Sequence, residues 1–130
     1  MVRAIRGAIT VENNTKEEIL GATRELLEEM IKANNIEHDS LIQMIFTLTP
    51  DLDAVFPAVC AREMGYGDVP LMCMSEINVE GALKKCVRIL VQINCDKKLG
   101  DINHIYLKEA KKLRPAHSHC TECCLIHHIC

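Results

Sequence analysis

The stretch VPLMCMSEINVEGALKKCVRILVQINC, residues 69–95, decides the fold, because it holds two apolar runs joined by a polar link. The first run ends just before Glu76. In the second run, every second residue from Val87 to Ile93 is apolar. Short apolar runs and period-two alternation are typical of strands in a buried sheet. The stretch therefore predicts two strands, with a turn at Gly81 between them.

Arg88 lies on the opposite face of the alternating run. Its neighbours on that face are Cys86, Leu90 and Gln92. Such surroundings are unfavourable for a charge unless a partner or an anionic ligand meets it. The turn allows Glu76 to lie near Arg88 on an adjacent element. Two interpretations of this pair stay open: a structural ion pair that closes a sheet end, and a polar pocket for an anion.

Length and composition indicate a single small domain. The chain has 130 residues, of which 48% are hydrophobic and 3% aromatic, with no Trp. Its core must therefore be aliphatic, and small aliphatic domains often complete their burial by forming oligomers. The formal net charge is -3 and there is no basic run, so nucleic acid is not expected as a partner.

The sequence favours a cytoplasmic protein that does not enter a membrane. No apolar segment approaches the roughly 20 residues that span a bilayer, and the N-terminus lacks an apolar signal core. Four of the eight cysteines sit singly in apolar segments, which is typical of reduced core thiols. These are Cys60, Cys73, Cys86 and Cys95.

The N-terminal third reads as a strand and a helix. Residues 2–10 alternate as a strand and place Arg6 among small apolar side chains, which we interpret as an edge-strand arginine that reaches solvent. Thr15 and Glu18 form a capping box, and the apolar stripe that follows predicts a helix over residues 16–33.

The remaining elements complete a mixed sheet. We expect strands at residues 41–49 and 103–107, a short helix from Pro57 to about Met64, and a helical turn at 108–115. Phe56 is expected in core or subunit packing, and Tyr106 as a cap on the core. The order of elements predicts an α/β (α+β) single domain whose five-stranded mixed sheet is covered on one face by one long helix.

Five separated blocks carry a resemblance to a known family. They are IRGAITVE at 5–12, TPDLDAVFPA at 49–58, AREMG at 61–65, VPLMCMSEINVEGALKKCVRIL at 69–90 and IYLKEAKKLRP at 105–115. In this order they resemble the monofunctional, barrel-type chorismate mutases of the AroH class. The resemblance implies a homotrimer that forms a pseudo-α/β barrel, with active sites between subunits that convert chorismate to prephenate without a cofactor.

The same resemblance implies roles for individual residues. Arg6 would bind a substrate carboxylate, and Arg88 would face both the ether oxygen and a carboxylate. Glu76 and Cys73 would hold the ring hydroxyl. Tyr106 would contact a carboxylate.

Three further residues would complete that site. Phe56 and Arg62 would come from the adjacent subunit, and Arg114 would belong to a C-terminal segment that settles over the ligand. The rearrangement is intramolecular and pericyclic, so it requires no nucleophile, proton relay or metal. An enzyme accelerates it by holding the reactive conformer and by stabilising negative charge on the ether oxygen.

The last residues depart from the family pattern. We expect residues 1–115 to form the chorismate mutase domain and residues 116–130, AHSHCTECCLIHHIC, to form a flexible tail rich in Cys and His. Cys120 and Cys123 form a CxxC pair near His127, a weak candidate set for zinc that lacks the second pair of a closed site.

Two alternatives to the enzyme stay open. One is a non-catalytic trimeric module of the same fold that binds or senses a small anion. The other is a redox or metal sensor that works through the tail, which predicts that deletion of residues 116–130 removes function. The enzyme interpretation predicts that most activity survives this deletion.

Overall fold

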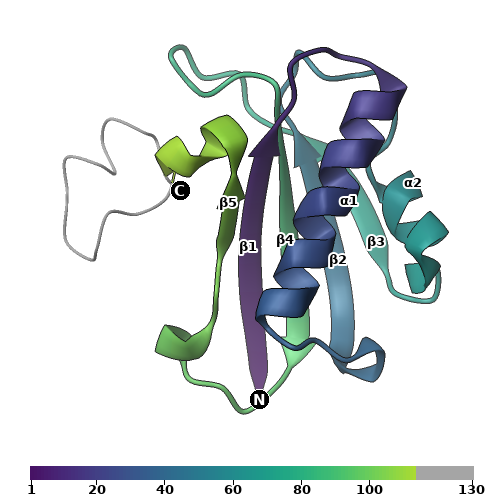
Figure 1. Ribbon diagram of the computed structural model, residues 1–130, viewed down its shortest axis with the longest axis vertical. Helices are drawn as coiled ribbons and strands as arrows, with labels where there is room; N and C mark the ends of the chain where they lie inside the picture. Colours follow the sequence, from purple (N-terminus) through teal and green to yellow (C-terminus); the bar gives the residue numbers. More distant parts are fainter. Residues whose placement is uncertain (114–130) are drawn as a thin grey trace.

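The sheet of this protein has five strands in the order β3-β2-β4-β1-β5 (Figure 1). The computed structural model describes residues 1–113. The strands are β1 (Val2–Thr10), β2 (Leu41–Leu48), β3 (Leu71–Ser75), β4 (Cys86–Asn94) and β5 (Ile105–Leu107). Strand β4 pairs antiparallel with β1 and β2, whereas β1–β5 and β2–β3 are parallel pairs. The prediction of a mixed five-stranded sheet is confirmed.

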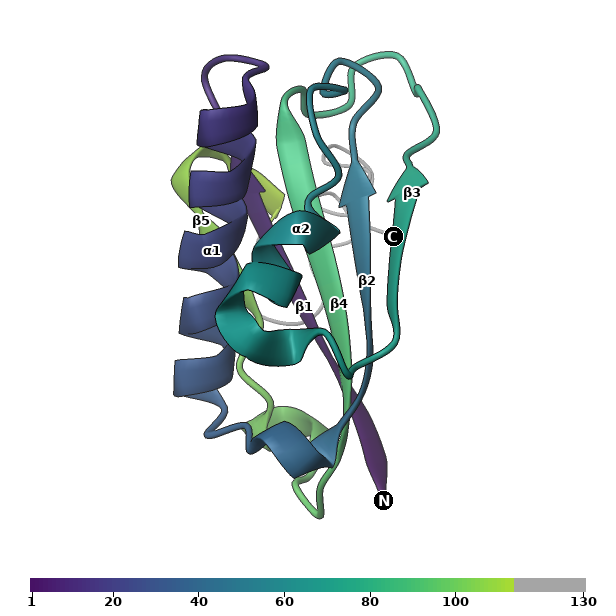
Figure 2. The same ribbon diagram turned by 90° about the vertical axis from the view of Figure 1, so that its right-hand side faces the viewer.

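The helices lie on one side of this sheet (Figure 2). They are α1 (Lys16–Ala33) and the short α2 (Ala58–Ala61), which continues into the π-helical turn η2 (Arg62–Tyr66). The 3-10 turns are η1 (His38–Ser40), η3 (Leu99–Asp101) and η4 (Lys108–Leu113). Within residues 1–113, no helix has the length and apolar character needed to cross a membrane.

The N-terminus of α1 is fixed by the predicted capping residues. The Glu18 backbone N–H donates to the Thr15 hydroxyl at 3.2 Å, and the Glu18 carboxylate accepts from the Asn13 backbone N–H at 3.1 Å. A hydrogen bond with the Asn13 side chain is the largest cause that lowers the pKa of Glu18, and the Asn13 backbone N–H contributes less. The box therefore closes two positions before the N-cap, whereas in its usual form the N-cap N–H itself is the donor.

The core lies between α1 and the sheet. The side chains Val87, Ile89, Val91 and Ile93 of β4 are at most 2% exposed, as the alternation predicted. The helix lies so close to β1 that a Cβ on Gly7 would clash with the buried Met30 sulfur. Gly7 is therefore required for this approach of helix to strand. We call this side of the sheet the helix face.

Local backbone geometry sets the element boundaries. β4 begins at Cys86, because Lys85 has a positive φ of 50° that breaks the strand. The Asp51 carboxylate fixes this point by accepting the Lys85 backbone N–H at 2.9 and 3.1 Å. Gly65, at φ 97°, ends the regular helical backbone after α2, as expected of a C-terminal glycine.

Two sequence expectations about strand neighbours are wrong. β1 is not an edge strand, because β4 and β5 pair with it on both sides, so Arg6 projects from the interior of the sheet. The segments that carry Glu76 and Arg88 are not adjacent either, because β2 lies between β3 and β4. The apolar run at 69–74 joins β2 in parallel, and the chain then crosses the end of β2 to reach β4.

The four cysteines among the described residues are free thiols. Cys60 and Cys86 are buried, while Cys73 and Cys95 are partly buried. Burial raises the pKa of Cys60 to about 11 and that of Cys86 to about 12. Buried thiols with such raised pKa values are poor nucleophiles, as predicted for core cysteines. Cys120 and Cys123 lie outside the described residues.

Candidate active site

Five side chains form a row across the whole sheet. The strand register pairs Met74 with Thr47, Thr47 with Arg88, Arg88 with Ala8, and Ala8 with Tyr106. Directly paired residues in a sheet point to the same side. The row therefore lies on the face opposite α1, which we call the open face.

A cavity of about 310 Å³ lies over this row. It collects the predicted residues Arg6, Arg88 and Tyr106. The other lining residues are Gly7, Ala8, Ile45, Thr47, Met74, Ile89, Leu90 and Leu113. Ala8 is small and 1% exposed, so the cationic and phenolic side chains on either side of it share one space. The site combines two guanidiniums, a phenol and an apolar wall.

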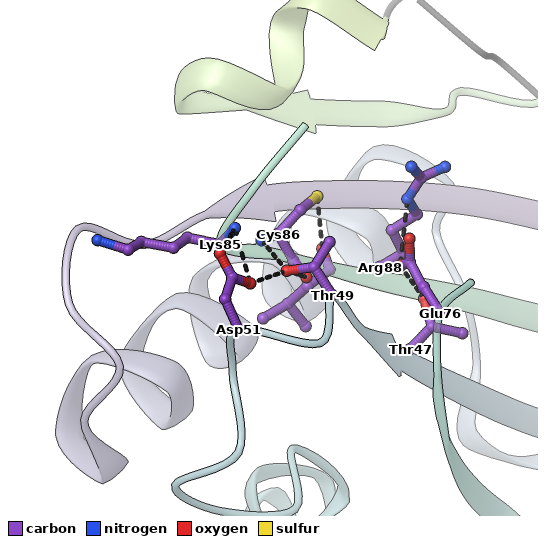
Figure 3. A network of polar contacts seen from close by, with 8 residues as sticks. Thr47, Thr49, Asp51, Glu76, Lys85, Cys86 and Arg88 are labelled. Atoms are coloured by element: carbon purple, nitrogen blue, oxygen red, sulfur yellow. Dashed lines mark hydrogen bonds and ion pairs between the residues drawn. The ribbon is translucent and has the colours of Figure 1, made fainter. Parts of the chain in front are cut away.

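Arg88 is held from one side only. Its Nε lies 3.3 Å from Glu76 Oε2, and the two side chains are 30% and 18% exposed. The expected proximity of this pair is confirmed. Yet Nε is buried without a well-aligned hydrogen-bond acceptor, so the contact is a charge pair and not a directed bond. Figure 3 shows the two terminal nitrogens of Arg88 pointing away from Glu76.

Glu76 follows β3, which is separated by β2 from the strand β4 that carries Arg88. The Glu76 backbone N–H donates to the Leu48 carbonyl at 2.8 Å, and its carboxylate accepts from the Thr47 hydroxyl at 2.5 Å. Both contacts come from the C-terminal end of β2. The carboxylate is therefore fixed where the chain leaves the sheet, before the link to β4 begins (Figure 3).

Arg6 is positioned through its main chain by β5. Its backbone N–H donates to Nδ1 of His104 at 2.9 Å, so this ring nitrogen is unprotonated. Desolvation of the ring, and then the Arg6 charge, lower the pKa of His104. The neutral imidazole thus ties β5, which carries Tyr106, to β1, which carries Arg6.

Other predicted site residues lie apart from this cavity. Cys73 pairs with the buried Phe46, so its side chain points to the helix face. It lines a second cavity of about 570 Å³ together with Phe56. Phe56 is 71% exposed and therefore is not a core residue of the single chain. Met74 lines both cavities and separates them.

Arg62 is exposed on η2, on the helix side of the sheet. The single chain does not bring Phe56 or Arg62 together with Arg6 and Arg88, because Phe56 lines the second cavity and Arg62 lines neither cavity. Arg114 and the tail candidates Cys120, Cys123 and His127 lie outside the described residues. Within residues 1–113, no group of three or more His, Cys, Asp or Glu side chains is arranged to hold a metal ion.

Sequence reasoning missed Thr47, Met74 and His104. For Thr47 a signal was present, because residues 44–48 alternate between buried Met44, Phe46 and Leu48 and the less buried positions between them. That alternation places Thr47 on the face opposite the core. For His104 the signal was only its alternation with Tyr106.

The chemistry available on the open face is electrostatic. Guanidiniums bind carboxylates through forked donors, and a phenol adds a further hydrogen bond. The buried thiols are not activated, and the cavity offers no paired nucleophile and base. Fold and site together are suited to a protein class that would hold a small, oxygen-rich anion and act on it through fixed charges.

Comparison with known proteins identifies the family to which this chain is similar. The family model for chorismate mutase type I matches residues 2–117. Chorismate mutase AroH of Bacillus subtilis (strain 168) is 47% identical over 116 residues, which cover 88% of this chain and 91% of that protein. Chorismate mutase AroH of Thermus thermophilus is 48% identical over 116 residues, or 88% and 95% of the two chains.

The structural comparison agrees with the sequence comparison. The chorismate mutase from Clostridium thermocellum is similar with a TM-score of 0.82 and 52% identity, over 84% of this chain and 97% of that one. The chain belongs to the chorismate mutase type I family. The fold and family expected from the sequence blocks are thereby confirmed.

Proposed function

We propose that this protein converts chorismate to prephenate at the open-face cavity, and that a homotrimer completes each site with residues of a neighbouring subunit. The observation that carries this proposal is the state of Arg88. Its Nε faces Glu76, while its terminal nitrogens point away from that carboxylate. A partly buried guanidinium left incompletely satisfied is suited to meet charge that develops on a ligand.

Arg88 is the residue to which we assign rate acceleration. In the rearrangement one C–O bond breaks as one C–C bond forms, and partial negative charge grows on the ether oxygen. A fixed cation aimed at that oxygen binds the transition state more strongly than the substrate. Removal of even one neutral oxyanion donor in other enzymes costs about 3 to 4 kcal/mol, so the contribution of Arg88 should be at least as large.

The remaining side chains hold the reactive conformer. We assign Arg6 and Tyr106 to the substrate carboxylates, and Glu76 to the ring hydroxyl. Cys73 lies in the cavity of Phe56, so its proposed contact with the hydroxyl requires the two cavities to act together. Binding both ends of the substrate in a compact geometry lowers the entropic part of the barrier.

A trimer accounts for the exposed apolar side chains near the site. Phe56 is 71% exposed, Met72 57%, Met74 44% and Leu90 37%. Clustered exposed apolar residues mark interaction surfaces. We propose that Phe56 and Arg62 of one subunit enter the site of the next, where Arg62 orients the substrate.

We propose that the catalytic domain spans residues 1–115, with Arg114 contributing to closure over the ligand. Residues 116–130 are an accessory segment in this proposal, and no cofactor takes part. Prephenate leads to phenylalanine and tyrosine, and we expect the enzyme in the cytoplasm.

The first test is loss of chorismate absorbance with the purified full chain, with and without a chelator. We expect rapid conversion to prephenate that ignores the chelator. Arg88→Gln keeps much of the side-chain volume without the charge, and it should lower kcat at least about 100-fold. A folded wild-type trimer without turnover would favour the anion-binding module, and chelator-sensitive turnover would favour a role for the tail.

The second test is subunit complementation. Arg88→Gln and Arg62→Ala proteins should each have low activity as homotrimers. If a site takes Arg88 from one subunit and Arg62 from the next, every mixed trimer formed by co-refolding regains a wild-type site. Activity should therefore rise on mixing. Mixed trimers no more active than their parents would contradict the shared site.

A further inference from the structure

Thr47 lies beside Arg88 on the neighbouring strand and lines the same cavity. Its hydroxyl donates to Oε2 of Glu76 at 2.5 Å. This is the oxygen that lies 3.3 Å from Nε of Arg88. One carboxylate oxygen is therefore shared between a hydroxyl and a guanidinium (Figure 3).

Glu76 needs an anchor because of its place in the chain. It follows Ser75, the last residue of β3, and it precedes a segment whose residues 77–81 are exposed. Among residues 1–113, Thr47 provides the hydrogen bond to this carboxylate, while the Leu48 carbonyl accepts the Glu76 backbone N–H and holds only the main chain. Without the Thr47 hydroxyl, Arg88 would be the remaining polar side chain in contact with the Glu76 carboxylate among the described residues.

A carboxylate whose partner is an arginine prefers the two-point arrangement. In that arrangement both oxygens face both donors of one guanidinium edge, which is stronger than a single charged contact. Such a pair would occupy terminal donors of Arg88 that point away from Glu76 here. It would also engage both oxygens of Glu76 and so compete with a ligand hydroxyl for that carboxylate.

We propose that Thr47 is a positioning residue for the rearrangement. Its hydroxyl holds Glu76 beside Nε and so prevents a two-point pair between Glu76 and Arg88. The terminal nitrogens of Arg88 then stay available for the ether oxygen and a carboxylate of the substrate. This inference rests on the proposed function, because it assigns Thr47 a part in the same reaction.

The test compares two substitutions at Thr47 with one elsewhere. Thr47→Val keeps the shape and removes the hydroxyl, and it should lower kcat about 10- to 100-fold, since misplacement of a catalytic group by about 1 Å costs about 100-fold. KM should change less, because Arg6 and Tyr106 keep their places. Thr47→Ser retains the hydroxyl and should recover most of the turnover.

Thr23→Val is the matched control. Thr23 is fully buried in α1 on the helix face, where its hydroxyl donates to the Ile19 carbonyl at 2.6 Å. The substitution removes a hydroxyl of the same kind without any link to Glu76. It should leave kcat unchanged. A fall in kcat equal to that of Thr47→Val would show that the loss is one of general stability.

A double substitution separates positioning through Glu76 from a direct role. If Thr47 acts through that carboxylate, Thr47→Val in a Glu76→Gln background should change kcat by less than about twofold, because the two changes are coupled. A full additional loss in that background would overturn the inference and assign Thr47 a direct contact with substrate.

Crystal structures of wild type and Thr47→Val give a readout independent of turnover. We expect the valine variant to show Glu76 rotated into a two-point pair with Arg88. An unmoved carboxylate would overturn the positioning role whatever the kinetics. A folded wild-type protein that does not convert chorismate would instead contradict the proposed function. The two crystal structures would then test only whether Thr47 keeps Glu76 out of a two-point pair with Arg88.

Discussion

The two faces of the sheet are built by alternate residues of the same strands, yet they differ in almost every physical property. On the helix face, Val87 and Ile89 of β4 are buried against α1. On the open face, Arg88 between them is partly exposed, and its Nε lacks an aligned acceptor. The apolar side chains of the helix face are buried within one chain. On the open face, η4 covers Ala8 and Cys86, whereas Arg88 Nε has no aligned acceptor among the described residues, so charge remains available there for a ligand.

This contrast predicts that substitutions on the two faces of β4 separate stability from activity. Ile93→Ala removes a side chain that is 2% exposed and does not line the open-face cavity, so it should lower the free energy of unfolding by about 2 to 5 kcal/mol while leaving site geometry intact. Arg88→Gln should lower it by less than about 1 kcal/mol, because the pair is partly exposed and Glu76 keeps its bond to Thr47.

Urea unfolding of both variants, together with their kcat values, measures this separation. The control is wild type under the same conditions, with equal protein concentration because a trimer is stabilised by association. Comparable losses of stability in the two variants would contradict the inference that the helix face determines stability and the open face determines activity.

A smaller effect is expected at the edge of the open face, where His104 accepts the Arg6 N–H. The pKa of His104 is lowered in the folded chain, first by desolvation and then by Arg6. Between the folded pKa and the ordinary value of about 6.5, protons bind the unfolded chain preferentially. The stabilisation is therefore complete above about pH 6.5 and is lost as the pH falls through the folded pKa.

His104→Asn is the variant that isolates this contribution. The asparagine carbonyl can accept the same hydrogen bond and does not titrate. The free energy of unfolding of the variant should therefore fall less steeply below pH 6.5 than that of wild type. The difference should be small, because His104 is exposed and solvent screens its charge. Identical pH profiles would mean that the contact with Arg6 does not depend on protonation.

Local patterns in the sequence predicted the features that depend on neighbouring residues. The alternation of β4 identified Arg88 as the residue opposite the core, and Thr15 with Glu18 located the start of α1. These predictions succeed because side-chain direction and helix capping are set within a few residues.

Features that depend on distant pairing could not be read in this way. The insertion of β2 between β3 and β4 is a matter of long-range contacts, so the sequence interpretation placed Glu76 and Arg88 on adjacent elements. Alternation alone could place Thr47 on the open face, but its hydrogen bond to Glu76 joins distant parts of the chain and could not be predicted locally. Phe56 and Arg62 stay predictions, since one chain does not bring them to the cavity.

The row of Met74, Thr47, Arg88, Ala8 and Tyr106 takes one residue from every strand of the sheet. Because side chains alternate between faces, a one-residue insertion or deletion within a strand would turn the following residues to the wrong side. Outside the site residues, these strands should therefore tolerate changes of composition better than changes of length. Variation in length should be confined to the connecting loops, and relatives with loops of different size should align without gaps through all five strands.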